Sequence, residues 1–427
     1  MTKSLDSSAR DILRTNDKGG FTVPTAGLYP YQWNWDSVFV ALGFATFDEL
    51  RACAEIETLF EAQWDDGMVP HIIFRRDDPD YFPGPRVWQA GGDALPTSGI
   101  TQPPVAASVI NDLYSRVGSE PQERLAALFP KVLEWHRWFH KYRVPEGIDA
   151  VIITHPWESG RDNSPEWDAP SASIDVSNVE PYERRDLQHA DAEMRPTKLD
   201  YDRYIALVEY GRNARWDHEK IATEGPFRVA DVSMTMILLR ATRDLISFAG
   251  KIGQGGVREE LEGYVRQLER GANYLWDEAA GTFCSRDTIT GEHSGFVTNA
   301  SFLCYYAGAV TPEQATRMTA HWDRISTKAT YMLPSHDPDD GNFDAKRYWR
   351  GPIWQVVNYM LAKGFAENGL SAWAERIHND SGEMIRKHGF NEAFCPLTGE
   401  GSGGRDFSWT AAMWLAWCGR EAPDKKG

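Results

Sequence analysis

The chain has few cysteines, and they lack the spacings of paired or metal-bound thiols. Five occur in 427 residues, far apart and without a CxxC pair. We therefore expect neither a disulfide framework nor a zinc knuckle, and reduced thiols in the cytoplasm fit better. The first 17 residues lack the apolar core of a secretory signal. No run of 18 apolar residues occurs either, so no segment is expected to span a membrane.

Positive charge is also scarce, with 45 Lys and Arg against 62 Asp and Glu and a formal net charge of −17. Such a surface repels phosphate backbones, which argues against a nucleic-acid partner. A single local arginine can still bind a small anion. The motifs GxxxxGK[ST], HExxH and GxSxG are absent. Phosphate-loop, zinc-protease and serine-hydrolase chemistry are therefore not indicated.

Alternation with a period of two residues is scarce as well, and VIIT at 151–154 is a short strand candidate. Helical periodicity dominates instead. Residues 257–275 carry one apolar stripe, which predicts an outer, half-exposed helix. Residues 231–249 begin apolar nearly all round, which predicts an inner helix with Asp231 as its N-cap. Further helices are expected over 36–64, 102–117, 121–141, 200–213, 297–308, 312–324, 352–366, 371–388 and 408–419.

About a dozen helices of these two kinds predict an all-α toroid with an inner and an outer ring. An ordinary helical bundle is the alternative. No linker or composition shift marks a boundary, so one domain over residues 1–427 is expected. Long loops at 65–101, 155–198 and 326–351 separate the helices. Loops of this length within a compact domain are usually functional.

Aromatic residues are abundant, with 17 Trp, 16 Tyr and 19 Phe. They could simply fill a large core. A buried indole N–H needs a hydrogen-bond partner, however, which makes tryptophan a costly filler. The alternative is a sugar-binding cleft, where flat rings stack on the C–H faces of a pyranose.

The segment HPWESGRDNSPEWD, residues 155–168, offers a candidate general acid. Glycosidic cleavage needs two carboxyl groups, one of them protonated at rest. Asp162 follows a glycine by two residues and lies between Trp157 and Trp167, whose rings could raise its pKa by desolvation. Arg161 would lower that pKa, and we expect its side chain to point outward. The other acids of the segment, Glu158, Glu166 and Asp168, are not excluded by spacing and could equally form a salt-bridged loop.

The second carboxylate is expected from residues 389–415, which contain Glu392, Glu400 and Asp406. A general base must hold one water rigidly. Glu392 lies between two phenylalanines, whereas Glu400 is flanked by glycines and resembles a mobile turn residue. Glu392 is therefore the preferred base.

Other segments offer sugar contacts and an anion site. The stretch YPYQWNWD contributes Tyr31, Trp35 and Asp36, and RYWRGPIW contributes Tyr348, Trp349 and Trp354. These rings could also pack the ends of the toroid. Polar candidates from three further segments are Tyr81, Gln102, Arg195 and Tyr201. An arginine can bind a carboxylate through two parallel hydrogen bonds.

Neither a cofactor nor a metal is expected. The segment DPDDGNFD, residues 337–344, has calcium-like spacing in part. His336 and Pro338 stand where an EF-hand places oxygen ligands, so a solvated turn is preferred.

Seven blocks, in unbroken order from about residue 29 to 417, resemble glycoside hydrolase family 63. Within it they are most similar to the bacterial mannosylglycerate and glucosylglycerate hydrolases. The blocks are WNWDSVFVALG, YFPGP, TSGITQPPV, HPWESGRDNSPEWD, RPTKLDYDRY, KRYWRGPIWQVVNY and NEAFCPLTGE…FSWTAA. The chain departs from that pattern in a short stretch after YFPGP and in the glycine-rich GEGSGGRD.

The resemblance implies an (α/α)6 barrel that inverts the anomeric centre. It implies Asp162 as general acid and Glu392 as general base. Asp36 with Trp35, and Tyr348, Trp349 and Trp354, would contact the sugar. Trp157, chosen from its place beside Asp162 and not from the resemblance, is a further candidate substrate contact. The residues that it implies for glycerate binding are Tyr81, Gln102, Arg195 and Tyr201.

The leading hypothesis is therefore an inverting enzyme that hydrolyses a 2-O-α-glycosyl-D-glycerate to hexose and D-glycerate. An exo-α-glucosidase acting on short neutral oligosaccharides, a non-hydrolytic sugar-binding toroid and a sugar epimerase are the alternatives. An epimerase would need histidines as acid and base, and apart from His155 the histidines lie outside the strongest blocks. The sequence does not decide between mannose and glucose, and it leaves homo-oligomerisation open.

Overall fold

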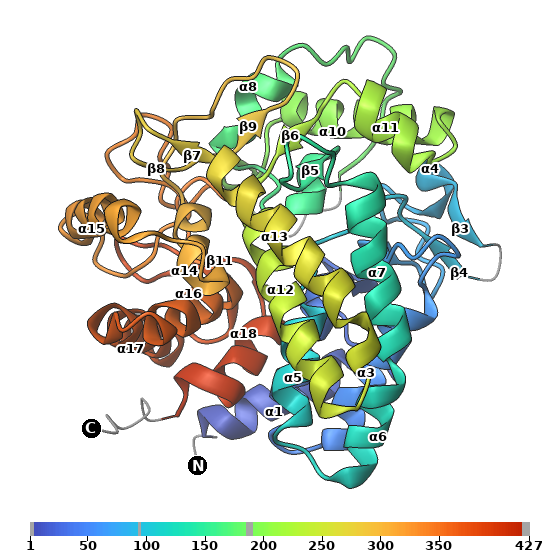
Figure 1. Cartoon of the computed structure of the whole chain (residues 1–427), viewed down its shortest axis with the longest axis vertical. Helices are drawn as coiled ribbons and strands as arrows, with labels where there is room; N and C mark the ends of the chain where they lie inside the picture. The colour runs from blue at the N-terminus through green and yellow to red at the C-terminus, as the bar shows by residue number, and fades with distance from the viewer. Residues whose placement is uncertain (1–3, 93–94, 185–190, 421–427) are drawn as a thin grey trace.

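The computed structural model describes residues 4–92, 95–184 and 191–420, and α-helices dominate these segments (Figure 1). The α-helices are α1 (Leu5–Asn16), α2 (Asn34–Phe44), α3 (Glu49–Glu61), α4 (Pro85–Trp88), α5 (Ala106–Tyr114), α6 (Ser119–Ala127), α7 (Phe129–Tyr142), α8 (Asp168–Ser171), α10 (Lys198–Asn213), α11 (His218–Glu224), α12 (Val232–Lys251), α13 (Arg258–Tyr274), α14 (Leu303–Ala307), α15 (Pro312–Ser326), α16 (Gln355–Glu367), α17 (Ser371–His388) and α18 (Ser408–Met413). Among these described residues, no helix has the length and apolar character needed to cross a bilayer.

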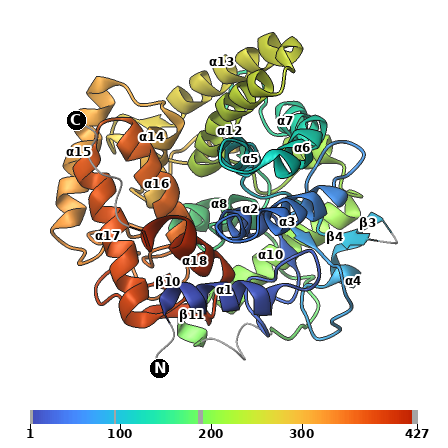
Figure 2. The same cartoon turned by 90° about the horizontal axis from the view of Figure 1, so that it is seen from below.

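Six of these helices form a closed inner ring in which each packs against the next. Their order around the ring is α2, α5, α12, α14, α16 and α18, and α18 packs back against α2. Figure 2 shows this ring at the centre of the molecule, with α1, α3, α7, α13, α15 and α17 around it. The protein is an all-α (α/α)6 barrel, as expected.

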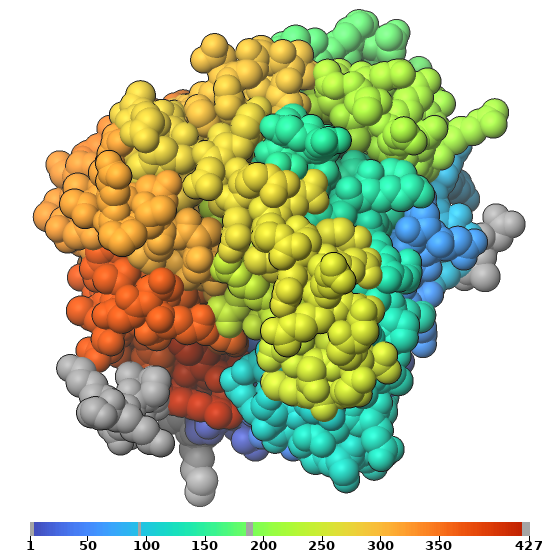
Figure 3. Space-filling model, viewed as in Figure 1, coloured from blue at the N-terminus to red at the C-terminus, as the bar shows by residue number. Residues whose placement is uncertain are grey.

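Burial follows the two layers. Every residue of α2 is buried, as an inner helix covered on all sides requires. Helix α13 buries one stripe and exposes its charged face, and Figure 3 shows it, in yellow, lying across the outer surface. Helix α12 is largely buried, and Asp231 accepts a hydrogen bond from the backbone N–H of Met234. The predictions of an outer helix over 257–275 and of an inner helix with an Asp231 N-cap are both confirmed.

The predicted helices exist, but several of their boundaries were wrong. The run 36–64 is two helices, because the chain turns after Phe44 and Asp48 caps the N-terminus of α3. The run 121–141 is also two, with Pro130 in the first turn of α7. Helix α1 was not predicted at all. The α-helical part of 408–419 ends at Met413 and continues as a π-type turn.

Short antiparallel strands connect the helices and shape their loops. They are β1 (Gln32–Trp33), β2 (Ile72–Ile73), β3 (Ala90–Gly92), β4 (Leu95–Thr97), β5 (Ile152–Ile153), β6 (Val229–Ala230), β7 (Trp276–Asp277), β8 (Thr282–Phe283), β9 (Arg286–Asp287), β10 (Asn391–Phe394) and β11 (Gly401–Arg405). The sheets have the orders β1-β2-β4-β3, β5-β6-β9, β7-β8 and β10-β11. Strand β5 confirms the candidate at 151–154. The predicted loops 65–101 and 155–198 include residues 93–94 and 185–190, which lie outside the described residues.

The two ends of the described chain meet, which closes the barrel. Helix α1 packs on α18. The Asn16 amide donates to the Asp406 carbonyl and to Ser408 Oγ, both at 3.0 Å. The Trp414 indole N–H donates to Asp6 at 2.8 Å. The outer helix at the start of the chain therefore holds the segment that links β11 to α18.

Candidate active site

Two adjoining pockets lie among the loops that precede the inner helices. The carboxyl pocket, of about 50 Å³, is lined by Asp36, Asp162 and Glu392 together with Trp35, Gln102 and Trp409. The arginine pocket, of about 70 Å³, is lined by Arg195 together with Tyr81, Trp157, Tyr201 and Tyr204. Five residues line both pockets: Tyr29, Trp33, His71, Asp162 and Tyr348. Asp162 therefore stands where the two pockets meet.

The loop that carries Asp162 is held from several directions. Gly160, with φ at +68°, lies so close to Trp35 that an added Cβ would come within 2.7 Å of the indole. The Tyr204 hydroxyl donates to the Asp162 carbonyl at 2.8 Å. The Asn163 amide donates to the Tyr348 carbonyl at 3.2 Å. These contacts fix the backbone on both sides of the carboxyl group.

The electrostatics suit a proton donor. Burial raises the pKa of Asp162 to about 7, and the nearby Glu392 charge adds to the increase, while Arg195 opposes it. A carboxyl group with this pKa is still largely protonated at slightly acid pH. That is the state in which a general acid must rest.

Glu392 lies on β10 and is 1 % exposed. Its Oε1 accepts hydrogen bonds from the hydroxyls of Tyr29 at 3.0 Å and Tyr348 at 3.2 Å. Its Oε2 accepts from the backbone N–H of Gly404 at 2.8 Å. Burial raises the pKa of Glu392, whereas Arg195 and these three donors hold it down. The group is thus rigidly placed, as a base that positions one water must be.

Asp36 completes a cluster of three carboxyl groups, of which Asp36 and Glu392 are buried and Asp162 is partly buried. Burial raises its pKa well above the usual value, and the charges of Glu392 and Asp162 raise it further. Three such groups near one another cannot all ionise cheaply. The pocket therefore favours a mixed state of protonated and ionised carboxyls, which gives it both hydrogen-bond donors and acceptors.

Arg195 is the cation of the second pocket. Its guanidinium lies over the Tyr348 ring, 4.2 Å from the centroid, and its Nη2 donates to the Tyr29 hydroxyl at 3.3 Å. It lowers the pKa of both Asp162 and Glu392. A buried arginine at a pocket wall is suited to binding a carboxylate.

The structure brings most of the predicted site residues together, with three exceptions and one change of place. Tyr31, Trp349 and Trp354 do not line either pocket. Trp349 stacks on Trp354 at 4.0 Å, and the Tyr31 ring lies edge-on to Tyr81 at 5.0 Å, so they support the walls from behind. Gln102 lies in the carboxyl pocket, apart from Arg195, and its side-chain oxygen accepts from the backbone N–H of Trp35 at 3.3 Å.

Tyr29 and His71 are two of the pocket residues that escaped the sequence-based reasoning. Tyr29 precedes the singled-out Tyr31 by two positions and contacts both Glu392 and Arg195. His71 lies on both pocket walls, beside the rings of Trp88 and Trp157. Burial holds the pKa of His71 well below its usual value, so the ring is neutral. Tyr29 could have been found within its aromatic cluster, but no local signal marked His71.

The expectation that Arg161 points outward was wrong. The side chain is buried and pairs with Glu166 and with Asp231. A buried carboxylate on each side stabilises the guanidinium in place of water. The Arg161 charge is therefore kept away from the Asp162 carboxyl group by these buried ion pairs, and not by exposure to solvent.

The acidic segment 337–344 is occupied by ion pairs. Arg324 bonds to Asp337 and to Asp339, and His336 lies 3.0 Å from Asp340. Within the described ranges, no three His, Cys, Asp or Glu side chains gather in a way that could hold a metal ion.

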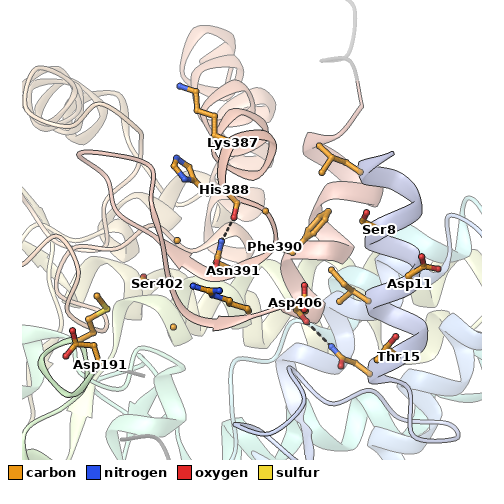
Figure 4. A pocket seen from close by; sticks show the side chains of 18 residues that line it. Ser8, Asp11, Thr15, Asp191, Lys387, His388, Phe390, Asn391, Ser402 and Asp406 are labelled. Carbon is orange, nitrogen blue, oxygen red and sulfur yellow. Dashed lines mark hydrogen bonds between the residues drawn. The ribbon is translucent and has the colours of Figure 1, made fainter. Parts of the chain in front are cut away.

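A larger hollow, of about 1030 Å³, lies on the other face of the β10–β11 hairpin (Figure 4). Neighbouring strand residues point to opposite faces, so Asn391 lines this hollow while Glu392 faces the carboxyl pocket. The Asn391 amide donates to the His388 carbonyl at 2.8 Å. The hollow contains none of the three clustered carboxyl groups, so its size does not make it the reaction site.

A helical barrel with paired carboxyl groups at its loops is the arrangement expected of a glycoside hydrolase. The chain belongs to the MGH1-like glycoside hydrolases: the model of the mannosylglycerate hydrolase MGH1-like glycoside hydrolase domain matches residues 29–410.

Curated relatives align along nearly the whole chain. Mannosylglycerate hydrolase MGH1 of Selaginella moellendorffii is 44 % identical, over 96 % of this chain and 84 % of its own. The mannosylglycerate hydrolase of Thermus thermophilus is 45 % identical, over 96 % of this chain and 99 % of its own. The glucosylglycerate hydrolase of Mycolicibacterium hassiacum is 33 % identical, over 97 % and 98 %.

Solved structures agree with this assignment. The GH63 mannosylglycerate hydrolase from Thermus thermophilus in complex with Tris and D-glycerate superposes with a TM-score of 0.93. It is 45 % identical and covers 97 % of this chain and all of that chain. Neutral trehalase Nth1 from Saccharomyces cerevisiae, at 15 % identity and a TM-score of 0.60 over 93 % of this chain and 72 % of its own, shares the fold.

Proposed function

We propose that this protein is an inverting glycoside hydrolase that cleaves 2-O-α-glycosyl-D-glycerates, with mannose or glucose as the sugar, into hexose and D-glycerate. One observation carries the proposal. Asp162 stands at the wall shared by the two pockets, with Glu392 in one pocket and Arg195 in the other. In such a substrate the glycosidic oxygen joins the hexose to the glycerate. Asp162 would therefore face that oxygen, Glu392 the hexose and Arg195 the carboxylate.

In the proposed reaction the hexose occupies the carboxyl pocket. Asp162 gives its proton to the glyceryl oxygen as the bond from that oxygen to the anomeric carbon breaks. Glu392 takes a proton from a water that attacks the same carbon from the opposite face. The product is therefore the β-anomer, and the pair should lie roughly 6.5–9.5 Å apart to leave room for the water. Two carboxyl groups and one water suffice, so no cofactor is needed.

The arginine pocket is proposed to hold glycerate. Arg195 would bind the carboxylate, and the hydroxyls of Tyr81 and Tyr201 would bind the remaining oxygens. The relatives named as mannosylglycerate and glucosylglycerate hydrolases support this choice of substrate. In the carboxyl pocket, Asp36 would hydrogen-bond the hexose hydroxyls beside Trp35, and Gln102 would do so from the opposite segment.

The test follows the released sugar directly. Purified protein is incubated separately with α-mannosylglycerate, α-glucosylglycerate and a neutral α-linked glucose disaccharide, and proton NMR records the first anomer to appear. We expect β-hexose from the glycerate compounds and little release from the disaccharide. First appearance of the α-anomer would exclude inversion, and faster cleavage of the disaccharide would indicate an exo-α-glucosidase. Hexose binding without turnover would point to a non-hydrolytic toroid.

The same proposal extends to location and organisation. All five cysteines are buried as free thiols, which suits a reducing compartment such as the cytoplasm. We further infer one catalytic domain over residues 1–427, because the first and last helices of the ring complete the same barrel.

A further inference from the structure

Arg161 directly precedes the proposed acid, yet its side chain turns away from both pockets. Its Nη2 bonds to Asp231 at 2.7 Å, its Nη1 bonds to Glu166, and its Nε donates to Ser233 Oγ at 3.1 Å. The guanidinium also lies 5.0 Å from the Trp167 ring centroid. All three charged groups are at most 3 % exposed by side chain. We call Arg161, Glu166 and Asp231 the loop triad.

The loop triad connects three separate parts of the fold. Asp231 is the N-cap of the inner helix α12, where it also accepts from the Ser233 hydroxyl at 2.6 Å. Glu166 accepts from the backbone N–H of Ser285, between β8 and β9, at 3.3 Å. Arg161 lies on the loop that carries Asp162. The acid loop is therefore tied to the barrel wall through charge-assisted hydrogen bonds, which are stronger than neutral ones.

The peptide units of Arg161 are fixed at the same time. Its carbonyl accepts from the Trp167 indole N–H at 2.8 Å, and its N–H donates to Ser159 Oγ at 2.9 Å. With the side chain also anchored, little rotation remains for the backbone that leads into Asp162.

The triad also explains how a cation can lie next to an acid that must stay protonated. Two carboxylates surround one guanidinium, so the local charge is negative once both are ionised. Burial raises the pKa of Glu166, but Arg161 outweighs it, and the net pKa lies below the usual value. Burial raises the pKa of Asp231 while Arg161 opposes that increase, so Glu166 is the carboxylate that balances the Arg161 charge more firmly. The charged neighbours that act on Asp162 are Arg195 and Glu392.

We propose that Arg161 is a positioning residue of the hydrolytic reaction: through Glu166 and Asp231 it holds the Asp162 loop against helix α12, so that the acid reaches the glycosidic oxygen. This role rests on the proposed function. Misplacing a reacting group by about 1 Å costs on the order of 10²-fold in rate. Loss of the triad is therefore expected to lower kcat while substrate binding in the two pockets persists.

The test compares Arg161→Lys, Arg161→Met and Glu166→Gln with the control Arg51→Met. Arg51 also bonds two acids, Asp17 at 2.8 Å and Glu55 at 2.6 Å, but on the outer helix α3. We expect Arg161→Met to lose about 10²-fold in kcat with KM changed less than about threefold. Arg161→Lys should recover part of that loss, because it keeps the charge. The control should lower Tm and leave kcat unchanged.

Hydrogen–deuterium exchange gives a second readout that needs no substrate. Peptides covering residues 157–168 should exchange faster in the Arg161 and Glu166 variants than in the wild type and in Arg51→Met. All assays are run well below each variant's Tm. If Arg161→Met fails to fold, Arg161→Lys and Glu166→Gln still decide the matter. Unchanged kcat in those two variants would overturn the positioning role, whatever the exchange data show.

The two proposals can fail separately. A wild-type protein that hydrolyses no glycosylglycerate would refute the proposed function, whatever the exchange data show. An active wild type whose triad variants retain full kcat would refute the positioning role alone.

Discussion

Acidic side chains in one short segment have opposite electrostatic roles because their neighbours differ. Glu158 bonds to Arg143 at 3.0 Å and to the Thr154 N–H at 2.7 Å. Glu166 pairs with Arg161, and Asp168 with Arg350 at 2.6 Å. Asp162 alone among these four faces both pockets, and its pKa is raised to about 7. Spacing could not separate these acids, whereas their partners do.

Removing either member of the carboxyl pair should stop turnover without preventing binding. For Asp162→Asn and Glu392→Gln we expect kcat to fall about 10²–10⁴-fold, the usual contribution of a general acid or base. Both variants keep the shape of the pocket, so glycosylglycerate should still bind in isothermal titration calorimetry. Near-normal turnover by Asp162→Asn would remove it from the role of acid.

The pH dependence of kcat/KM should be bell-shaped. Activity needs Asp162 protonated, so it should decline as pH rises through about 7. It also needs Glu392 ionised, so it should decline at low pH, through a value above that of an ordinary glutamate. The two groups interact, so the limbs report apparent values of the pair. Initial rates between pH 4 and 9 check this, and a profile that is flat from pH 6 to 8.5 would contradict it.

Arg195 should distinguish charged from neutral substrates. In Arg195→Ala we expect kcat/KM for a glycosylglycerate to fall about 10- to 100-fold, the worth of a charge-assisted hydrogen-bond pair. A neutral aryl glycoside should be affected far less. Removal of the cation should also move the alkaline limb to higher pH, because Arg195 lowers the pKa of Asp162. Equal losses on both substrates would exclude a carboxylate-binding role.

The site residues that the sequence did not reveal are those whose contacts come from distant parts of the chain. Tyr29 bonds to Glu392, which lies 363 positions away in the chain, and His71 has no chemically suggestive neighbours in sequence. Arg161 was expected to point outward because a cation beside Asp162 would lower its pKa. Glu166 of the same segment pairs with it, but Asp231, which helps to hold it inward, lies 70 positions away in the chain. Family blocks pointed to the proposed acid and base, but pairing across the barrel decides which side chains reach them.

At the level of elements, the structure explains why strand β11 is rich in glycine. Gly403 has φ at +74°, and an added Cβ would stand 2.2 Å from Glu392 Oε2. The next residue, Gly404, supplies the backbone donor to that oxygen. The glycines that made this segment look like a mobile turn therefore allow the backbone to approach Glu392, the proposed base, closely.

Gly403→Ala should displace the base. We expect kcat to fall about 10²-fold, because Glu392 must shift to admit the methyl group. Gly253→Ala is the matched control: Gly253 has the same φ of +74°, but no atom lies within 4 Å of its added Cβ. Both variants carry the left-handed strain, so similar decreases in Tm with loss of kcat only in Gly403→Ala would support the assignment. Equal kcat in the two would contradict it.

Helix existence was predictable from periodicity, whereas helix ends were not. The stripe of 257–275 and the apolar start of 231–249 identified an outer and an inner helix correctly. The breaks after Phe44 and at Leu128 depend on how the chain turns between layers, which apolar spacing does not encode. Helix α1 escaped notice because residues 1–17 were considered only as a signal segment.

At the scale of the whole molecule, two layers of helices could be inferred, but their order around the ring could not. That order depends on contacts such as α18 with α2, which join the two ends of the chain. The same closure places the segments carrying Asp36, Asp162 and Glu392 around one pocket, although they are distributed over most of the sequence.

The raised pKa of Asp162 should cost the barrel stability at neutral and alkaline pH. The folded-state pKa of Asp162 is about 7, above its usual 3.8, so the folded state holds more protons than the unfolded state between these values. Stability contributed by this group is complete below about pH 3.8 and falls as pH rises to 7. Asp162→Asn avoids this penalty and should increase the free energy of unfolding by up to about 4 kcal/mol at pH 8. Urea unfolding at pH 4.5 and pH 8 tests this, since the gain should be small at the lower pH.

The join between α1 and the β11–α18 link has a practical consequence for recombinant work. The Asn16 amide donates to the carbonyl of Asp406. Asp406 lies two positions after Gly404, whose backbone N–H donates to Glu392. A shortened protein that starts after residue 16 would lose the Asn16 hydrogen bonds to Ser408 and to the Asp406 carbonyl, and we expect its kcat to fall. Truncations should therefore keep helix α1, and affinity tags should not disturb it, even though it lines neither the carboxyl pocket nor the arginine pocket.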